Sequence, residues 1–299
     1  MTEFKRGIRN ERFINELQRL SKIDGWWRDI LLDTSLIIAV RDEYLNVYWL
    51  GQSIFRVAIQ NGSIVATTHP KYLLDPALDK LVRFDGVNFD LGSIEKGSLI
   101  RTYEPGKTLN KLKTAAGLFA GDEKRGVHDI VISNNSVVDV EIAMQAGDVQ
   151  DVGSLPRADI AAFEKDKQGI HLVLWEAKTF YNSELRTTGK KNVVDQIEKY
   201  KKVVAAHRQS MIQSYECIAK NLIAISNMSE GRRKFNDAIR KVADGAELMI
   251  RKPADVGLIV FGFDEAQRKG VWIPRSNRLI AELGKSRVKA RGKAKGLKI

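Results

Sequence analysis

Apolar positions in the first third of the chain follow two different spacings. Over residues 8–21 they recur at about helical spacing, which predicts an amphipathic helix. Four β-prone runs come next, over residues 35–40, 44–50, 53–59 and 63–68. Gly51-Gln52 and Asn61-Gly62 separate the last three runs, and Asn-Gly between alternating strands is a strong hairpin signal. The pattern predicts a helix followed by an antiparallel β-meander.

The remainder of the chain alternates predicted helices with predicted strands. Helical spacing predicts helices over residues 109–119, 192–215, 229–243 and 278–283. Apolar runs predict strands over residues 127–132, 137–144, 157–165, 170–180, 221–226 and 256–263. The order is α-β-β-β-α-β with one extra strand, which indicates a mixed β-sheet flanked by helices.

The strands predicted over residues 157–165 and 170–180 have the layout of a β-hairpin, because a polar turn ending in Gly169 separates them. A turn centred at positions 167 and 168 brings Asp159 opposite Glu176. Lys178 is expected on the same face, since side chains alternate along a strand. A three-residue loop ending in Gly169 is an open alternative that would shift this register.

Two carboxylates held together inside a fold are costly unless a positive charge lies between them. A divalent cation meets this need, and oxygen ligands favour Mg²⁺, with Mn²⁺ as an expected substitute, over zinc. We expect Asp159 and Glu176 to bind the metal, with the carbonyl of Ala177 as a further ligand. Lys178 is then placed to orient or deprotonate a water or to stabilise charge on a phosphate.

A further acid lies on the strand predicted over residues 137–144. Apolar residues alternate there with Asp139 and Glu141, so both acids are expected on the polar face of a half-buried strand. If this strand neighbours that of Asp159, Glu141 could be an extra metal ligand or support one. A solvent-facing acid is an equally good interpretation.

These residues carry a resemblance to a known family. Asp159 followed by Glu176-Ala177-Lys178 at the end of an apolar strand resembles the D…(D/E)-x-K signature of the PD-(D/E)xK nuclease superfamily. Gln196-Ile-Glu-Lys-Tyr200 resembles the Q-x-x-x-Y motif of its exonuclease-like branch. The resemblance covers residues 107–228 and implies a restriction-endonuclease-like core, with Gln196 and Tyr200 positioning the substrate or Lys178. The leading Pro-Asp is not literal, since Pro156 precedes Asp159 by three residues.

The same residues also have explanations that involve no function. Acid-x-Lys triplets also occur at Glu3-Phe-Lys5 and Asp122-Glu-Lys124, which we attribute to chance. Asp159 and Glu176 as a solvated pair would destabilise a hairpin, because like charges would face each other. Lys178 alone reads as a solvated strand-end residue, and core packing alone can explain Tyr200 on its helix face.

The composition of the chain predicts that it binds a polyanion. The 299 residues carry a formal net charge of +12, and the last fifteen contain a cluster of basic residues without apolar periodicity. We expect this segment to be disordered in isolation and to contact nucleic acid through Lys285, Arg287, Lys289, Arg291, Lys293 and Lys295. The alternatives are a solubility tail and a membrane-surface patch.

A single cysteine, Cys217, excludes an intramolecular disulfide and favours a reducing compartment. No apolar run approaches the roughly 20 residues of a membrane span, and no signal-peptide core follows Met1, so a cytoplasmic location is expected.

The sequence therefore predicts an α+β (α/β) protein in three parts. Residues 1–105 form an N-terminal α+β domain of unassigned role with a β-meander, residues 106–283 a nuclease-like domain, and residues 284–299 a basic tail. The predicted activity is Mg²⁺-dependent hydrolysis of DNA phosphodiester bonds by an endonuclease of restriction, repair or defence against foreign DNA. RNA as the substrate, a homodimer and an activating protein partner stay open. The alternative is a nucleic-acid-binding or protein-interaction module that keeps the fold without cleaving.

Overall fold

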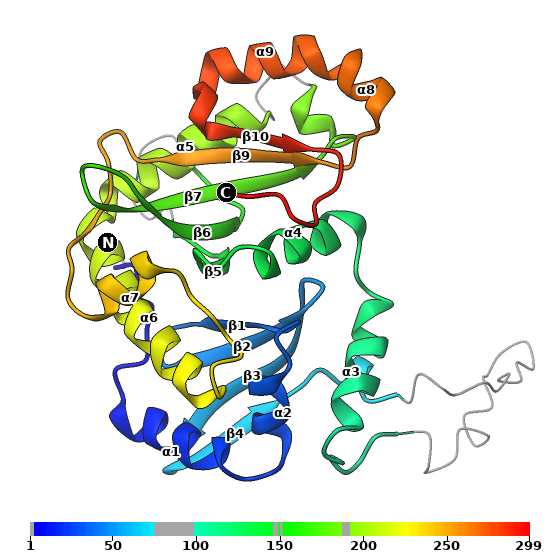
Figure 1. Ribbon diagram of the computed structural model, residues 1–299, viewed down its shortest axis with the longest axis vertical. Coiled ribbons are helices and arrows are strands. Elements are labelled where there is room, and N and C mark those ends of the chain that lie inside the picture. Colours follow the sequence, from blue (N-terminus) through cyan, green and yellow to red (C-terminus); the bar gives the residue numbers. More distant parts are fainter. Residues whose placement is uncertain (1–2, 75–98, 146–148, 150–151, 187–191) are drawn as a thin grey trace, which may run out of the picture.

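The computed structural model describes residues 3–74, 99–145, 149, 152–186 and 192–299, and in this part of the chain the strands form two sheets (Figure 1). The first is antiparallel, in the order β1-β2-β3-β4. Its strands are β1 Ile37–Val40, β2 Tyr44–Trp49, β3 Gln52–Gln60 and β4 Ser63–Thr67. Asn61 and Gly62 form the last turn with φ of 49° and 79°, the left-handed conformation that Asn-Gly favours. The predicted meander is confirmed.

Helices α1 (Glu11–Ser21) and α2 (Trp26–Leu32) precede this sheet. The Asn10 side chain caps α1 by accepting a hydrogen bond from the backbone N–H of Phe13. Phe13 and Leu17 are fully buried, as the helical spacing predicts. The short 3₁₀ helix η1 (Pro70–Tyr72) and helix α3 (Thr108–Gly117) follow the meander in the described chain.

The second sheet is mixed, in the order β10-β9-β7-β6-β5, with the short β8 (Leu248–Met249) also paired to β7. Strands β5, β6 and β7 are antiparallel, whereas β9 runs parallel to β7 and β10 runs parallel to β9. The bounds are β5 Val137–Ile142, β6 Ala158–Lys165, β7 Ile170–Thr179, β9 Val256–Phe261 and β10 Val288–Arg291. Strand β7 is therefore internal and is buried along almost its whole length.

Helices cover both faces of the mixed sheet. Helix α4 (Asp122–Ile132) packs Ile130 on the face that carries Trp175 and Ala177, and Figure 1 shows α4 between the two sheets. On the opposite face lie α5 (Val193–Ala206), α6 (Arg208–Met228) and α7 (Asp237–Ala243). Helices α8 (Glu265–Lys269) and α9 (Trp272–Leu283) lie beyond β9 and β10 (Figure 1). No helix of the described chain combines the length and apolarity that a bilayer span requires.

Four predictions of secondary structure in this half differ from the structure. Residues 127–132 are helical rather than extended, and residues 221–226 lie inside α6. The helix predicted over residues 192–215 is interrupted at His207, and the one predicted over residues 229–243 is limited to α7. Short apolar runs fit a buried helix as well as a buried strand, so periodicity cannot distinguish them.

The C-terminal segment is not a disordered tail, contrary to the prediction. Lys285–Arg287 form a 3₁₀ helix, η5, and β10 extends the sheet. Arg287 lies between two carboxylates, donating to Glu164 at 2.9 and 3.0 Å and to Asp255 at 2.9 and 3.1 Å. Leu297 is 3% exposed, and its carbonyl accepts a hydrogen bond from Asn134. Pairing to β9 and burial of apolar groups order this segment despite its charge.

A buried charge network connects the two sheets. Asp139 on β5, predicted on a polar face, has no exposed side-chain surface and forms an ion pair with Arg41, which follows β1. The Arg41 guanidinium also donates to the carbonyl of Val140 (2.7 Å) and to the hydroxyl of Tyr48 (3.2 Å). Arg6 lies 3.8 Å from the other Asp139 oxygen. The strand irregularity between Val137 and Asp139 explains why simple alternation misplaced this acid.

Candidate functional site

The hairpin of β6 and β7 has the predicted register. Its pairs run from Lys165 opposite Ile170 to Ile160 opposite Trp175, and the same register brings Asp159 opposite Glu176. The turn is centred at residues 167 and 168, as predicted. The Asp166 carboxylate stabilises it by accepting hydrogen bonds from the N–H groups of residues 168 and 169.

Glu176 is 3% exposed and accepts hydrogen bonds from three side chains. Its Oε1 accepts from Gln196 Nε2 (2.9 Å) and pairs with Lys178 Nζ (2.8 Å), and its Oε2 accepts from the Tyr200 hydroxyl (3.1 Å). Gln196 Nε2 also lies 2.6 Å from the Tyr200 hydroxyl. Helix α5 therefore places both predicted residues on this carboxylate, because positions four apart share a helix face.

Asp159 completes a pair of buried carboxylates. It is 8% exposed, and its Oδ2 accepts a hydrogen bond from the backbone N–H of Ala177 (2.9 Å). Burial raises the pKa of Asp159 well above its usual value, and the neighbouring charge of Glu176 raises it further. Burial also raises the pKa of Glu176, although Lys178 opposes that shift. Additional positive charge beside these carboxylates would stabilise their ionised forms.

Lys178 is buried rather than a solvated strand-end residue. It is 7% exposed, and its ammonium group lies between Glu176 (2.8 Å) and Glu184 (2.7 Å). Glu184 belongs to the short 3₁₀ helix η4 (Ser183–Leu185), which begins four residues after the end of β7. Burial alone would lower the pKa of Lys178, but attraction and hydrogen bonding to the two glutamates outweigh burial and raise it. In this arrangement Lys178 is a fixed cation.

Glu141 lies on β5 opposite Asp159, since Val140 pairs with Ile160 and Ile142 with Ala158. Its backbone has the left-handed φ of 51°, which is uncommon for a residue with a side chain. The carboxylate forms an ion pair with Lys124 and lies 3.9 Å from Arg157. Glu141 is therefore a third acid across three neighbouring strands, but it already has cationic partners.

Sequence reasoning missed Lys124 and Glu184. Lys124 belongs to the Asp122-Glu-Lys124 triplet that we attributed to chance, yet α4 brings it to Glu141. Burial would lower the pKa of Lys124, but the charges of Glu141 and Asp159 raise it. Nothing in the sequence relates Glu184 to Lys178 beyond a separation of six residues.

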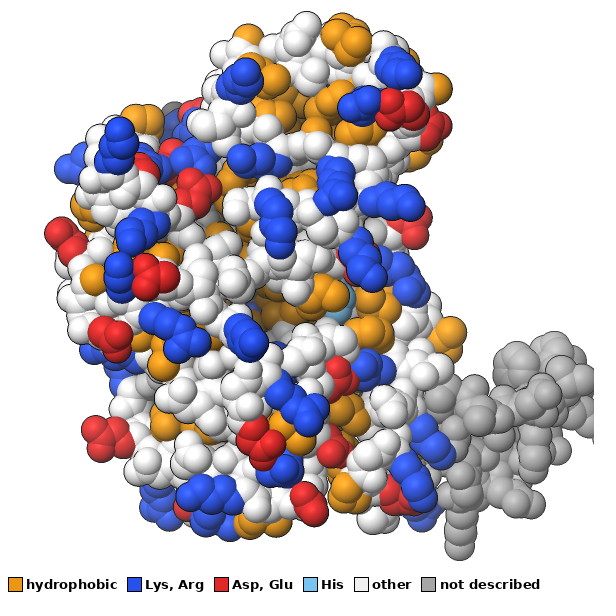
Figure 2. Space-filling model, in the orientation of Figure 1, with side chains coloured by type: hydrophobic (Ala, Val, Ile, Leu, Met, Phe, Trp, Pro, Cys, Tyr) orange, Lys and Arg blue, Asp and Glu red, His pale blue; other side chains and the backbone are white. Residues whose placement is uncertain are grey.

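The basic C-terminal residues lie apart from this cluster along the sheet. Strand β10 is separated from β7 by β9, and Arg287 is held by Glu164 and Asp255 rather than free to contact a partner. Lys285, Arg291, Lys293 and Lys295 are exposed, and Lys289 is half-buried. Figure 2 shows lysine and arginine side chains spread over the face of this view, with acidic side chains among them. Basic side chains are therefore not confined to the predicted C-terminal tail.

The residues present fit a hard divalent cation. Asp159 and Glu176 offer oxygen ligands from neighbouring strands. Burial and the charge of Glu176 raise the pKa of Asp159, so a cation beside it would stabilise its ionised form. Within the described residues, no group of three or more His, Cys, Asp or Glu side chains is arranged to hold a metal. A cation would thus need Asp159, Glu176, a backbone carbonyl such as that of Ala177, and water, with Glu141 available only after release from Lys124.

Replacing Tyr200 by phenylalanine tests the role of its hydroxyl. We expect a loss of about 1.5–3 kcal/mol in the free energy of unfolding, because a buried carboxylate loses a donor while the ring keeps its packing. Urea titration without divalent cations measures this loss. The control is Tyr103→Phe, which removes a 2.7 Å hydrogen bond to Asp29 away from Glu176. Equal stability of Tyr200→Phe and the unmodified chain would contradict a hydrogen bond that supports Glu176.

In comparisons with known proteins, no protein-family model, no curated protein and no solved structure matches the chain.

Proposed function

We propose that this chain is a Mg²⁺-dependent nuclease that hydrolyses DNA phosphodiester bonds. The observation that carries the proposal is the juxtaposition of two buried carboxylates, Asp159 and Glu176, with the buried ammonium group of Lys178. Burying such charges is costly, so a protein keeps them where they serve a purpose beyond stability.

The topology is consistent with the resemblance to PD-(D/E)xK nucleases. Helix α4, strands β5, β6 and β7 and helix α5 follow one another as the resemblance implies. The predicted last strand over residues 221–226 is helical, so β9, which comes after α6, α7 and β8, would take its place. The motif residues come from the expected places, with Asp159 on β6, Glu176 and Lys178 on β7, and Gln196 and Tyr200 on α5. We propose a restriction-endonuclease-like core on this basis.

Asp159 and Glu176, with the carbonyl of Ala177, would hold the cation, and Mn²⁺ is expected to replace Mg²⁺. The bound cation would supply a water of lowered pKa and neutralise charge on the phosphate. Gln196 and Tyr200 fix the orientation of the Glu176 carboxylate, since they donate to its two oxygens. Lys178, held by Glu176 and Glu184, presents positive charge where a phosphate oxygen becomes more negative.

One observation favours the alternative of a non-cleaving nucleic-acid-binding module. Both oxygens of Glu176 already have protein partners, and such a satisfied network is also what a purely structural site would contain. The two functions differ in a measurable way. A nuclease must exchange some of these contacts for a cation, whereas a binding module keeps them and responds to Mg²⁺ only through screening.

Cleavage of circular and linear DNA, with Mg²⁺ and with a chelator, tests the proposal. We expect the unmodified chain to cut circular DNA only with Mg²⁺, and Asp159→Asn to be at least about a hundredfold slower, beyond the cost of losing a group that only supports a ligand. Asp166→Asn is the matched control, because it changes an acid of the same hairpin at the turn and asparagine can keep the turn hydrogen bonds.

Thermal unfolding provides a readout that does not depend on cleavage. Mg²⁺ should raise the melting temperature of the unmodified chain and of Asp166→Asn, because binding to the folded state alone stabilises it. It should not raise that of Asp159→Asn. Cleavage that persists in the chelator, or in Asp159→Asn, would rule out this site as the catalytic centre.

A further inference from the structure

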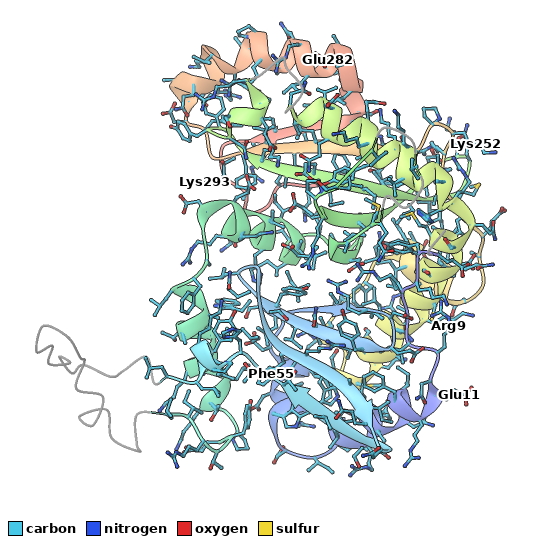
Figure 3. All side chains as sticks on the ribbon, turned by 180° about the vertical axis from the view of Figure 1, so that it is seen from behind. Arg9, Glu11, Phe55, Lys252, Glu282 and Lys293 are labelled. Atoms are coloured by element: carbon cyan, nitrogen blue, oxygen red, sulfur yellow. The ribbon has the colours of Figure 1, made fainter. Side chains whose placement is uncertain are left out.

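Three arginines surround the loop that follows β7. Arg186 follows η4, and Arg275 and Arg278 lie on α9, the outer helix that carries the labelled Glu282 in Figure 3. Each guanidinium donates one hydrogen bond to a carbonyl of the same loop: Arg275 Nη1 to Phe180 (2.9 Å), Arg278 Nη2 to Leu185 (2.7 Å) and Arg186 Nη2 to Tyr181 (2.9 Å). We refer to Arg186, Arg275 and Arg278 as the arginine cluster.

The positive charge of the arginine cluster is poorly compensated. In the described part of the chain, its one ion pair is that of Arg278 with Glu282, at 3.9 Å. Burial lowers the pKa of Arg275, and the like charges of Arg186 and Arg278 lower it further. Each guanidinium carries five N–H donors, and within the described residues Arg186, which is exposed, and Arg275, which is half-buried, each use one of them in a hydrogen bond to the protein. A planar fork of this kind matches the oxygens of a phosphate.

An exposed aromatic side chain lies beside the cluster. Tyr181 is 63% exposed, its ring packs edge-on against Phe180 with centroids 5.4 Å apart, and its hydroxyl accepts a hydrogen bond from Gln267 (2.5 Å). These contacts hold the ring in place while leaving much of its surface in solvent. A fixed, exposed aromatic ring next to guanidinium groups suits stacking of a nucleic-acid base, which needs an unpaired nucleotide.

The cluster is adjacent to the candidate catalytic residues. The loop begins immediately after Thr179, one residue beyond Lys178, and Glu184 of the same loop binds the Lys178 ammonium at 2.7 Å. Arg275 also stacks over the Phe180 ring, at 4.6 Å from its centroid. The loop therefore connects the arginine cluster to Lys178 through Glu184.

We infer that the arginine cluster and Tyr181 form a subsite for a single-stranded segment next to the bond that is cut. Arg186 and Arg275 bind backbone phosphates, and Tyr181 stacks on an unpaired base. The inference rests on the proposed nuclease function, and it adds that the substrate is unpaired on the Lys178 side of the site. A fully paired duplex would offer phosphates to the arginines but no base to Tyr181.

Binding measured in a chelator tests the subsite separately from cleavage. Fluorescence anisotropy would compare a labelled single-stranded oligonucleotide with a blunt duplex over a range of salt concentrations. The variants are Tyr181→Ala, the double variant Arg186→Ala/Arg275→Ala, and its charge-keeping partner with lysine at both positions. Arg268→Ala is the matched control, since Arg268 is a nearby exposed arginine that already pairs with Glu265.

We expect Tyr181→Ala to weaken single-strand binding by at least about fivefold, the lower range for one lost base stack, and to leave duplex binding unchanged. The double alanine variant should weaken both and reduce the log-log salt slope for single strands by up to about 1.4, whereas the lysine variant keeps most of the slope. Equal loss in Arg268→Ala, an unchanged salt slope in the double variant, or equal effects of Tyr181→Ala on both ligands would overturn the inference. Absence of Mg²⁺-dependent cleavage with these binding effects intact would overturn the nuclease proposal alone.

Discussion

Replacing Lys178 by alanine is expected to reduce DNA cleavage by on the order of a hundred- to a thousandfold, the usual cost of losing one preorganised group that stabilises developing charge. The same change should destabilise the metal-free protein by about 3–5 kcal/mol, because it leaves the buried Glu176 without its cation. A solvated strand-end lysine could be removed at little cost in stability, but Lys178 is 7% exposed. Cleavage kinetics with Mg²⁺ and urea unfolding in a chelator measure the two effects.

A lysine on the same hairpin provides the control for Lys178. Lys165 ends β6 and forms a half-exposed ion pair with Asp237 at 3.4 Å. Such surface pairs contribute little, so Lys165→Ala should change neither cleavage nor stability measurably. Lys178→Arg keeps the charge and should retain stability better than alanine. Full cleavage by a folded Lys178→Ala protein would remove this residue from the mechanism.

Replacing Asp139 by alanine is expected to lower the free energy of unfolding by about 3–5 kcal/mol, the cost of leaving a buried partner charge uncompensated. Arg41 and Arg6 would lose their shared acid, and their side chains are only 5% and 7% exposed. Burial alone would lower the pKa of Arg41, but the charge of Asp139 outweighs burial and raises it. Urea unfolding monitored by tryptophan fluorescence measures the loss.

An exposed acid provides a control that shows how much of the effect of Asp139→Ala is due to burial. Asp42 pairs with Arg9 at 3.8 Å, and both side chains are about half exposed, so Asp42→Ala should cause no measurable loss of stability. Asp139→Asn should fall between the two, because it keeps acceptor capacity without the charge. A loss below about 1 kcal/mol for Asp139→Ala, the range of surface pairs, would show that the network does not join the sheets.

The hairpin illustrates what one sequence can predict well. Its register depends on a local turn and on the side-chain period of two, and both can be read from consecutive residues. The positions of Asp159, Glu176 and Lys178 on one hairpin followed from that register alone. Gln196 and Tyr200 followed from helical spacing, although their contact with Glu176 required α5 to pack on the correct face of the sheet.

The predictions that were wrong depended on contacts between segments that are distant in the sequence. Residues 127–132 and 221–226 are short apolar runs whose conformation depends on the surface that buries them. The last fifteen residues read as a charged tail because their order comes from β9, Glu164 and Asp255, which lie far away in sequence. Asp139 was predicted as a surface acid because its partners, Arg6 before α1 and Arg41 after β1, lie about a hundred or more residues away in the sequence.

The sequence by itself determined the elements whose geometry is local: the meander, the catalytic hairpin candidate, and the acid, acid and lysine that it aligns. Only the tertiary structure decided that Lys178 is buried between Glu176 and Glu184, that Lys124 neutralises Glu141, and that three arginines surround the loop after β7. The physical reason is the range of each interaction. Turn and strand preferences act between neighbours in the chain, whereas burial and charge pairing depend on which distant segments the fold brings together.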